Sequence, residues 1–381
     1  MGVMEMVFTE DRIRAMLETA SALVGLPVIY DDALFSSLNL DEINMKDFTT
    51  NDDLLRAGMT LEQIIEPNLV PLRLKGQSAA ELRQTFQDLP SVEKVIDVLS
   101  VGSRPFMIPA FVPNGCAEVS AGGSYSKMKP ICNDAFVKLI RCDPPKALVF
   151  SKDALISSGQ LDKLHVNTTE WAPKPGKING RVCLNASKSS KNFPSFNESI
   201  DYEQHDAMYE MPVLPLLDDV AEMACQQRDL YPGEQLGGAT VDVSAAYQQT
   251  PQSVGTAMLT NTIATTYLTT AGRVIHLIVM YLVGMFGCSR AGNVYCTCAK
   301  LIDELHNKDS DVRRSLTYID DGILINPRPL LASGVKAYCY GIEALFVNGS
   351  VDNDKIFILD NALTCIGWTF DFVTWTMRPT S

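Results

Sequence analysis

Short apolar runs bounded by turn-forming residues predict many strands in the second half of the chain. Ala147 to Phe150, Ala239 to Val243 and Leu316 to Ile325 are rich in aliphatic and β-branched residues, which favour strands. Val274 to Phe286 is the longest apolar candidate for a membrane span. It contains His276 and is shorter than a bilayer requires, so it predicts a buried strand or hairpin.

Helical spacing of apolar residues dominates the first third of the chain. The stretches Phe8 to Leu26, Glu62 to Val70 and Ala79 to Leu99 predict helices, whereas Pro and Gly residues mark Met107 to Gly123 as a loop. We therefore expect residues 1–134 to form a mostly helical N-terminal extension of unknown role. Later helices are expected at Ser151 to Leu164, Gly287 to Leu305 and Ala332 to Phe346.

Two adjacent carboxylates interrupt the apolar run at Tyr318-Ile319-Asp320-Asp321. The pattern predicts two short strands joined by a tight acidic turn, with Gly322 just past its tip. Adjacent carboxylates repel each other and are costly to desolvate, so such a hairpin needs a counter-charge. Oxygen ligands suit Mg²⁺, and a pair of divalent cations would supply that charge. An ordinary solvent-exposed Asp-Asp turn is the alternative interpretation.

A second acidic strand precedes this turn. Asp242 follows the apolar residues Ala239 to Val241 and lies 320 − 242 = 78 residues before Asp320. With this spacing, the two motifs resemble the reverse transcriptases of retrotransposon-type elements. The resemblance covers about residues 135–381, roughly two-thirds of the chain. It implies an α+β right-hand polymerase palm with fingers, in which helices pack on an antiparallel sheet. The thumb would be largely absent, because the sequence stops at Ser381, where a thumb would begin.

The resemblance assigns a two-metal centre to the acidic residues. Asp242, Asp320, Asp321 and the carbonyl of Val243 would hold two Mg²⁺ ions, with Mn²⁺ as an alternative. Tyr247 would be the steric gate that crowds a ribose 2′-hydroxyl and favours deoxynucleotides. An aromatic residue after a strand is also common in a core, and that interpretation stays open for Tyr247.

Further residues match the family's nucleotide-binding segments. Lys174 and Arg181, in a Pro-Lys hairpin between Glu170 and Asn185, would contact the triphosphate. Turn signals at Pro175-Gly176 and Asn179-Gly180 shape this hairpin. The alternative is that both cations are ordinary solvated charges on a hairpin.

Phe286, Gly287, Ser289 and Lys355 are further candidate positions. Phe286 and Gly287 match a Phe-Gly turn beneath the nascent base pair, and Gly287 would let the backbone approach the nucleotide. Ser289 is the expected N-cap of the helix that follows. Lys355 would be a general acid for pyrophosphate, or a plain surface lysine.

Three smaller signals complete the pattern. Asp218 and Asp219 are expected to cap a helix rather than to bind metal. Leu363 to Asp371 resembles the start of a primer-gripping hairpin, with its second strand at Trp375 to Arg378. Met285 and Gly292 depart from the family's usual prolines.

Composition restricts the remaining possibilities. A hydrophobic content of 46% and a charged content of 20% indicate a globular core. Ten cysteines and four histidines form no zinc pattern, and scattered cysteines without a secretory signal suggest reduced thiols. We therefore expect an intracellular protein, cytoplasmic or nuclear, that is not secreted and not membrane-bound. The net charge of −13 opposes nucleic-acid binding, which normally needs local positive charge.

The combined pattern predicts an RNA-directed DNA polymerase. Its expected partners are an RNA or DNA template with its primer and deoxynucleoside triphosphates, while its oligomeric state is open. One alternative is a decayed or domesticated module that binds nucleic acid or assembles without catalysis. A second alternative is an RNA-directed RNA polymerase, whose hairpin usually reads Gly-Asp-Asp.

Overall fold

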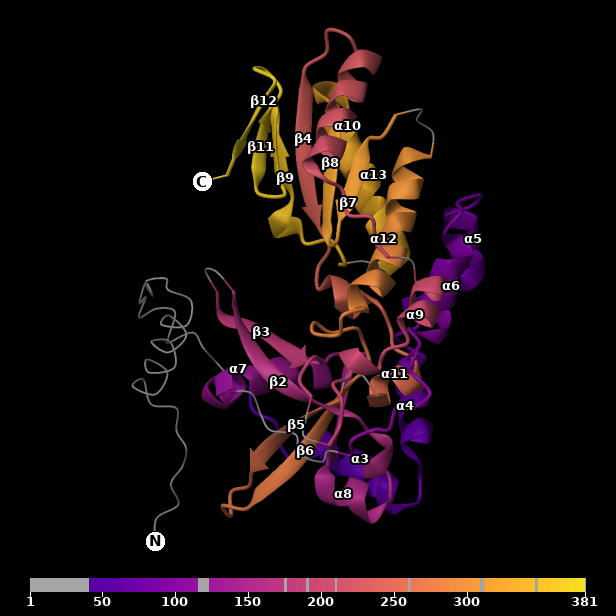
Figure 1. The fold of residues 1–381 in the computed structure, drawn as a ribbon, viewed down its shortest axis with the longest axis vertical. Coiled ribbons are helices and arrows are strands. Elements are labelled where there is room, and N and C mark those ends of the chain that lie inside the picture. Colours follow the sequence, from indigo (N-terminus) through magenta and orange to yellow (C-terminus); the bar gives the residue numbers. More distant parts are fainter. Residues whose placement is uncertain are drawn as a thin grey trace. The chain divides into compact units, whose positions relative to one another are not determined.

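The computed structural model describes residues 41–115, 123–174, 177–189, 192–209, 211–259, 262–308, 312–346 and 349–380. Helices packed with one mixed and two antiparallel sheets give the α+β fold predicted from the sequence (Figure 1). The chain divides into two compact units, each assembled from separate segments. The first unit comprises residues up to 72, 104–201 and 252–289, and the second unit comprises 73–103, 202–251 and 290–381.

A five-stranded sheet forms the centre of the first unit. Its strands are β1 (Ala147–Ser151), β2 (Val166–Lys174), β3 (Lys177–Asn185), β5 (Thr262–Leu268) and β6 (Val274–Tyr281). The order is β1-β6-β5-β2-β3, and every pairing is antiparallel except the short parallel contact between β2 and β5. The strands expected at Ala147 to Phe150 and within Val274 to Phe286 are both confirmed.

Strand β1 is buried on both faces, which explains why it reads as an unbroken apolar run. Leu148 and Phe150 belong to one hydrophobic cluster, whereas Ala147 and Val149 belong to the other. The helices of the unit are α3 (Lys46–Arg56), α4 (Leu61–Leu69), α7 (Gly123–Ile140), α8 (Lys152–Ser157) and α11 (Val254–Leu259). Side chains of α4, α8 and α11 fill the first cluster, and those of α7 fill the second.

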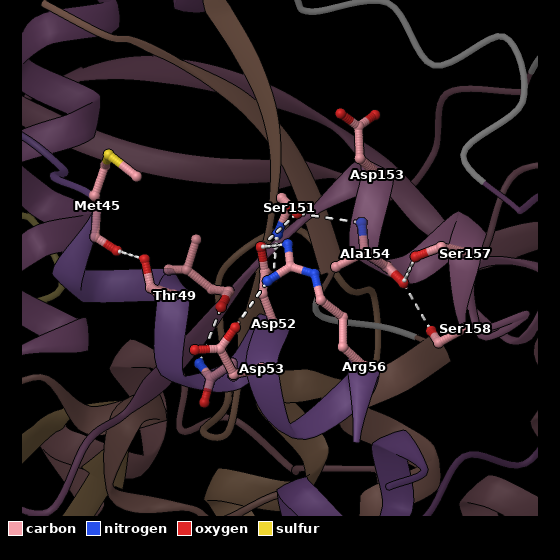
Figure 2. Close-up of polar contacts among 12 residues, drawn as sticks. Met45, Thr49, Asp52, Asp53, Arg56, Ser151, Asp153, Ala154, Ser157 and Ser158 are labelled. Atoms are coloured by element: carbon pink, nitrogen blue, oxygen red, sulfur yellow. Dashed lines mark hydrogen bonds and ion pairs between the residues drawn. The ribbon is translucent and has the colours of Figure 1, made fainter. Parts of the chain in front are cut away.

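A buried carboxylate joins α3 to the end of β1, as Figure 2 shows. Asp52 accepts hydrogen bonds from the Ser151 amide at 2.8 Å and from the Ser151 hydroxyl at 2.5 Å. The Ser151 oxygen in turn accepts from the Ala154 amide at 3.2 Å, so Ser151 is the N-cap of α8. Arg56 lies 3.6 Å from the same carboxylate. Asp52 therefore has a donor on each side, as a buried charge requires.

The second unit contains two antiparallel sheets. The four-stranded sheet has the order β7-β8-β4-β9, and its strands are β4 (Leu236–Asp242), β7 (Ser315–Tyr318), β8 (Asp321–Pro327) and β9 (Phe357–Leu359). The three-stranded sheet contains β10 (Ala362–Cys365), β11 (Trp368–Asp371) and β12 (Thr376–Pro379). The C-terminal hairpin expected from the sequence is thus a three-stranded meander, because the segment 363–371 itself folds back at Ile366-Gly367.

Helices α10, α12 and α13 pack on the four-stranded sheet of the second unit (Figure 1). The helices of this unit are α5 (Ala79–Thr85), α6 (Val92–Val101), α9 (Tyr202–Met208), α10 (Leu217–Leu230), α12 (Ala291–Asn307) and α13 (Arg328–Phe346). The Asp219 carboxylate accepts from the Leu216 amide at 2.7 Å, which confirms the predicted cap. The expected N-cap at Ser289 is wrong. Arg290 is the N-cap, and the Ser289 amide donates to the Asn197 side chain at 3.0 Å instead.

Two of the predicted helices and one predicted turn can be compared with the structure. Glu62 to Val70 corresponds to α4, but Ala79 to Leu99 divides into α5 and α6 around Pro90. Asn179-Gly180 is no turn, because both residues lie within β3. Gly180 has φ 52°, and a Cβ there would lie 2.4 Å from the Trp171 ring, so glycine is required.

The first predicted helix and the predicted domain boundary stay predictions. The helix predicted at Phe8 to Leu26 lies outside the described residues. The boundary at residue 134 stays a prediction, although α7 continues across it. In the described ranges, the structure contains no helix with the length and apolar character of a membrane span.

Candidate functional site

The predicted acidic residues meet at one end of the four-stranded sheet. Strands β4 and β8 pair so that Asp242 lies directly opposite Asp321. Strands β7 and β8 pair Tyr318 with Asp321, which leaves Ile319 and Asp320 as a two-residue turn. The Val243 amide donates to the Asp320 carbonyl at 3.1 Å. The structure thus confirms the predicted hairpin, with Asp320 and Asp321 at its tip and Asp242 beside it at the end of β4.

The turn is held in a strained backbone conformation. Ile319 has φ 57°, a value that β-branched residues seldom adopt because their side chains crowd the backbone. Such outliers persist only where the surrounding structure enforces them, and they gather at functional sites. Gly322 follows Asp321 and would clash with Tyr338 if it carried a Cβ, which would lie 2.3 Å from the ring.

Burial and the charges of neighbouring carboxylates raise the pKa of two of these aspartates, Asp321 and Asp242. Partial burial, followed by the charges of Asp320 and Asp242, raises the pKa of Asp321 to about 6. The pKa of Asp242 is also raised, chiefly by burial, although Lys355 counteracts this. A group of carboxylates that raise one another's pKa carries unbalanced negative charge.

Lys355 supplies the one cation seen at this cluster among the described residues. It ends a short 3₁₀ turn, Asn353–Lys355, and its ammonium contacts the carboxylates of Asp242 and, at 2.9 Å, Asp352. Burial lowers the pKa of Lys355, but these two contacts outweigh that effect and the net shift is upward. The Asp352 amide also donates to the Asp242 carbonyl at 3.0 Å. The sequence analysis did not predict that Asp352 belongs to this cluster. Its position three residues before Lys355 was the signal that could have indicated the ion pair.

The three aspartates fit a divalent cation in charge and in donor chemistry. All supply hard oxygen ligands. The pKa values of Asp242 and Asp321 are raised by burial and by the charges of the neighbouring aspartates, and a bound cation would relieve this repulsion. Across the described ranges, however, no three His, Cys, Asp or Glu side chains converge as a formed metal cage. The Asp242 carboxylate has a cationic partner in Lys355.

A cleft of about 420 Å³ opens beside the hairpin. Its walls include Tyr318 and Asp321 of the turn, Phe357 of β9 and Cys365 of β10. Asp321 therefore faces a space that a ligand can enter, which a buried structural carboxylate does not.

Tyr247, the predicted steric gate, lies in the 3₁₀ turn Ala246–Gln249 just after β4. Its ring packs edge-on against Tyr295 of α12 at 5.9 Å, and its hydroxyl would lie 3.6 Å from a Cβ at Gly292. Ala245 before it has φ 48°, which turns the chain sharply after the strand. The aromatic ring is thus half-buried and fixed in orientation, while its role beside a ribose stays a prediction.

Three of the predicted nucleotide-binding residues lie close together in the first unit. The Arg181 guanidinium lies 5.0 Å from the centre of the Phe286 ring, a cation–π contact. The Leu184 amide donates to the Phe286 carbonyl at 2.9 Å. Gly287 has φ 116°, and a Cβ there would lie 1.8 Å from the Leu184 carbonyl, so its close approach is to β3. Its approach to a nucleotide stays a prediction.

The ten predicted site residues therefore form two sets. The set in the second unit comprises Asp242, Val243, Tyr247, Asp320, Asp321 and Lys355, and the set in the first unit comprises Lys174, Arg181, Phe286 and Gly287. Lys174 is the last residue of β2, and its side chain lies outside the described part of the chain.

Comparisons with known proteins find similar solved structures but no match in sequence. No family model matches the sequence, and no curated protein matches it. Among solved structures, the chain is similar to the foamy viral protease-reverse transcriptase in complex with dsDNA, with a TM-score of 0.41 and 13% identity. The match covers 79% of this chain and 56% of that chain, so this chain spans little more than half of that protein's length.

Proposed function

We propose that this protein is an RNA-directed DNA polymerase that adds deoxynucleotides to a primer 3′-hydroxyl. One observation carries the proposal: Asp242 and Asp321 lie opposite each other on paired strands, with Asp320 at the adjoining turn. This is the arrangement implied by the sequence motifs, and it concentrates negative charge where cations would bind. In this proposal the second unit is the palm and the first unit carries the fingers.

Two Mg²⁺ ions, or Mn²⁺ in their place, would supply the charge neutralisation and the lowered pKa of the primer hydroxyl that phosphoryl transfer requires. Asp242, Asp320, Asp321 and the Val243 carbonyl are the groups that would hold them. Lys355 would leave Asp242 when cations bind. Its ammonium would then be available as the acid that protonates the departing pyrophosphate.

The first unit would bind the triphosphate of the incoming nucleotide. Arg181 presents a permanent positive charge, and stacking on Phe286 restricts its side chain before any nucleotide arrives. A guanidinium fixed in this way loses less conformational entropy when it binds a phosphate. Lys174, at the end of the preceding strand, would add a second cation.

Tyr247 would select the sugar. The ring is held against Tyr295, so it cannot easily move aside for a ribose 2′-hydroxyl. This favours deoxynucleotides and thus a DNA polymerase over an RNA polymerase.

Primer extension tests the proposal. The full chain would be given poly-rA/oligo-dT, Mg²⁺ and either dTTP or UTP, beside an Asp320→Asn, Asp321→Asn variant. Extension with dTTP by the native protein alone supports the proposal. Extension with UTP at an equal rate would favour the RNA polymerase, and equal extension by the double variant would exclude the proposed metal centre.

A non-catalytic module is the second candidate, favoured by the net charge of −13 and by the ion pair between Lys355 and Asp242. An internal ammonium at Asp242 neutralises the cluster without any metal. Binding of the primer-template without extension, by a protein that melts cooperatively, would support this candidate over the polymerase.

A further inference from the structure

A chain of hydroxyl groups lies beneath the acidic turn of the second unit. Thr317 of β7 is the strand partner of Gly322 in β8, one residue pair away from the pair that closes the turn. The Thr317 hydroxyl lies 2.7 Å from the hydroxyl of Tyr338, which is a buried residue of α13. The proposed catalytic machinery assigns no task to either residue.

Asp303 of α12 determines which of these hydroxyl groups donates and which accepts. Its carboxylate accepts hydrogen bonds from the side chain and backbone of Thr317 and from the Ser315 hydroxyl, the last at 2.9 Å. Because a carboxylate only accepts, the Thr317 hydrogen points to Asp303. The Tyr338 hydroxyl must then donate to Thr317. The resulting order is Tyr338 to Thr317 to Asp303, which connects α13 and α12 through β7.

The Tyr338 ring also contacts the turn directly. It lies so close to Gly322 that an added Cβ would be 2.3 Å from the ring and 2.8 Å from its hydroxyl. The ring is itself fixed from behind, because His306 packs edge-on against it at 5.5 Å. His306 is anchored in turn through a 3.2 Å contact with the Gly334 carbonyl.

The contacts of Tyr338 with Thr317 and Gly322 stabilise a turn that is otherwise strained and electrostatically repulsive. Ile319 is held at φ 57°, and the carboxylates of Asp320 and Asp321 repel each other and Asp242. Both effects favour a different arrangement of the turn in the absence of a cation. The contacts of Tyr338 with Thr317 of β7 and Gly322 of β8 oppose that rearrangement.

We propose that Tyr338, acting through Thr317, is a positioning residue that holds Asp320 and Asp321 ready for divalent cations before a cation binds. This inference rests on the proposed metal centre and adds a residue outside it. Pre-arranged ligands bind a cation more tightly, because the protein does not have to order them during binding.

Mn²⁺ binding to the full chain, followed by electron paramagnetic resonance without nucleotide or primer, tests this directly. Tyr338→Phe removes only the hydroxyl, and we expect it to weaken Mn²⁺ binding about fivefold, the effect of one lost hydrogen bond. Thr317→Val should weaken binding similarly, Thr317→Ser should restore it, and the two losses should not add. Tyr340→Phe is the matched control, since Tyr340 lies on the same helix and is 61% exposed.

A second readout separates positioning from mere stability. In metal-free protein, amide hydrogen exchange at residues 318–322 should accelerate in Tyr338→Phe and not in Tyr340→Phe. Faster exchange with unchanged Mn²⁺ affinity would show a purely structural role and overturn the inference. Unchanged affinity in Thr317→Val would also overturn it.

Failure of the proposed function gives a different result. If the native chain binds no Mn²⁺, or if Asp320→Asn, Asp321→Asn binds it equally well, the metal centre and the positioning role are both excluded. If the native chain binds Mn²⁺ through these aspartates but Tyr338→Phe has no effect, only the positioning role is lost.

Discussion

Two acidic sites in this chain satisfy their carboxylates in opposite ways. In the first unit, Asp52 accepts from the amide and hydroxyl of Ser151 and lies near Arg56, so donors surround it (Figure 2). In the second unit, Asp321 faces Asp242 across paired strands and borders a cleft. The difference separates a carboxylate that joins two elements of the fold from carboxylates that a cation would neutralise in the proposed function.

The surroundings of Asp321 also change its pKa. Asp321 is raised to about 6 by burial and by its acidic neighbours. Clusters of like charge that raise one another's pKa lie disproportionately at functional sites. The carboxylates of the second unit therefore store an unfavourable energy that binding can release.

The largest effect should come from Asp321→Asn. Loss of one proposed metal ligand should reduce primer extension at least about a thousandfold, because charge neutralisation contributes several kcal/mol to phosphoryl transfer. The same change should leave the thermal midpoint equal or higher, since it removes a repulsive charge. A lowered midpoint with retained extension would make Asp321 a structural residue like Asp52.

Asp52→Ala should have the reverse outcome. Removing the carboxylate leaves the Ser151 amide and hydroxyl without their buried acceptor, which should lower the free energy of unfolding by about 3 kcal/mol. Urea denaturation measures this loss. Asp53→Ala is the matched control, because the neighbouring Asp53 is exposed and pairs with Arg56 at 2.8 Å. It should cost less than about 1 kcal/mol. Equal losses in both variants would remove the distinction.

Asp303 should make stability depend on pH in the second unit. Burial raises its pKa to about 6, so the folded state keeps a proton that the unfolded chain loses near pH 4. Its contribution to stability is therefore complete below pH 4 and is lost as the pH rises through about 6. We expect Asp303→Asn to remove a decline on the order of 2 kcal/mol between these values. Urea denaturation of the native protein and of Asp303→Asn at several pH values would measure this decline. An equal dependence of the free energy of unfolding on pH in both proteins would contradict the raised pKa of Asp303.

The smallest effect is expected from Lys355→Met. Without a competing ammonium at Asp242, Mn²⁺ should bind up to about tenfold more tightly, since one attractive contact is no longer displaced. Extension should nonetheless fall if Lys355 protonates pyrophosphate. Weaker Mn²⁺ binding in this variant would show that Lys355 arranges the cluster rather than competing for it.

The sequence predicted the acidic hairpin well because its signals are local. Apolar and β-branched residues on both sides of Asp320-Asp321 predict two strands, and the adjacent carboxylates mark the tight turn between them. The pairing of β4 with β8 joins residues at least 79 positions apart, as Asp242 and Asp321 are. No local pattern reveals such a pairing, and only the resemblance to a polymerase family predicted that Asp242 lies beside the hairpin.

Other features depended on contacts that no local pattern reveals. Ser289 has the right residue type for an N-cap, but its amide donates to the side chain of Asn197, which is distant in sequence. Tyr338 lies on the apolar face of a predictable helix, yet its hydroxyl partner on β7 could not be inferred from helical spacing. Asn179-Gly180 resembles a turn, but the Trp171 ring requires that glycine within a strand.

The most direct test compares native protein, Asp321→Asn and Asp52→Asn in the extension of oligo-dT on poly-rA with dTTP and Mg²⁺. Extension would be normalised to the folded fraction of each protein. We predict that native protein and Asp52→Asn extend the primer at similar rates, whereas Asp321→Asn does not extend it. Equal extension by Asp321→Asn, or none by well-folded native protein, would contradict the assignment of catalysis to the carboxylates of the second unit.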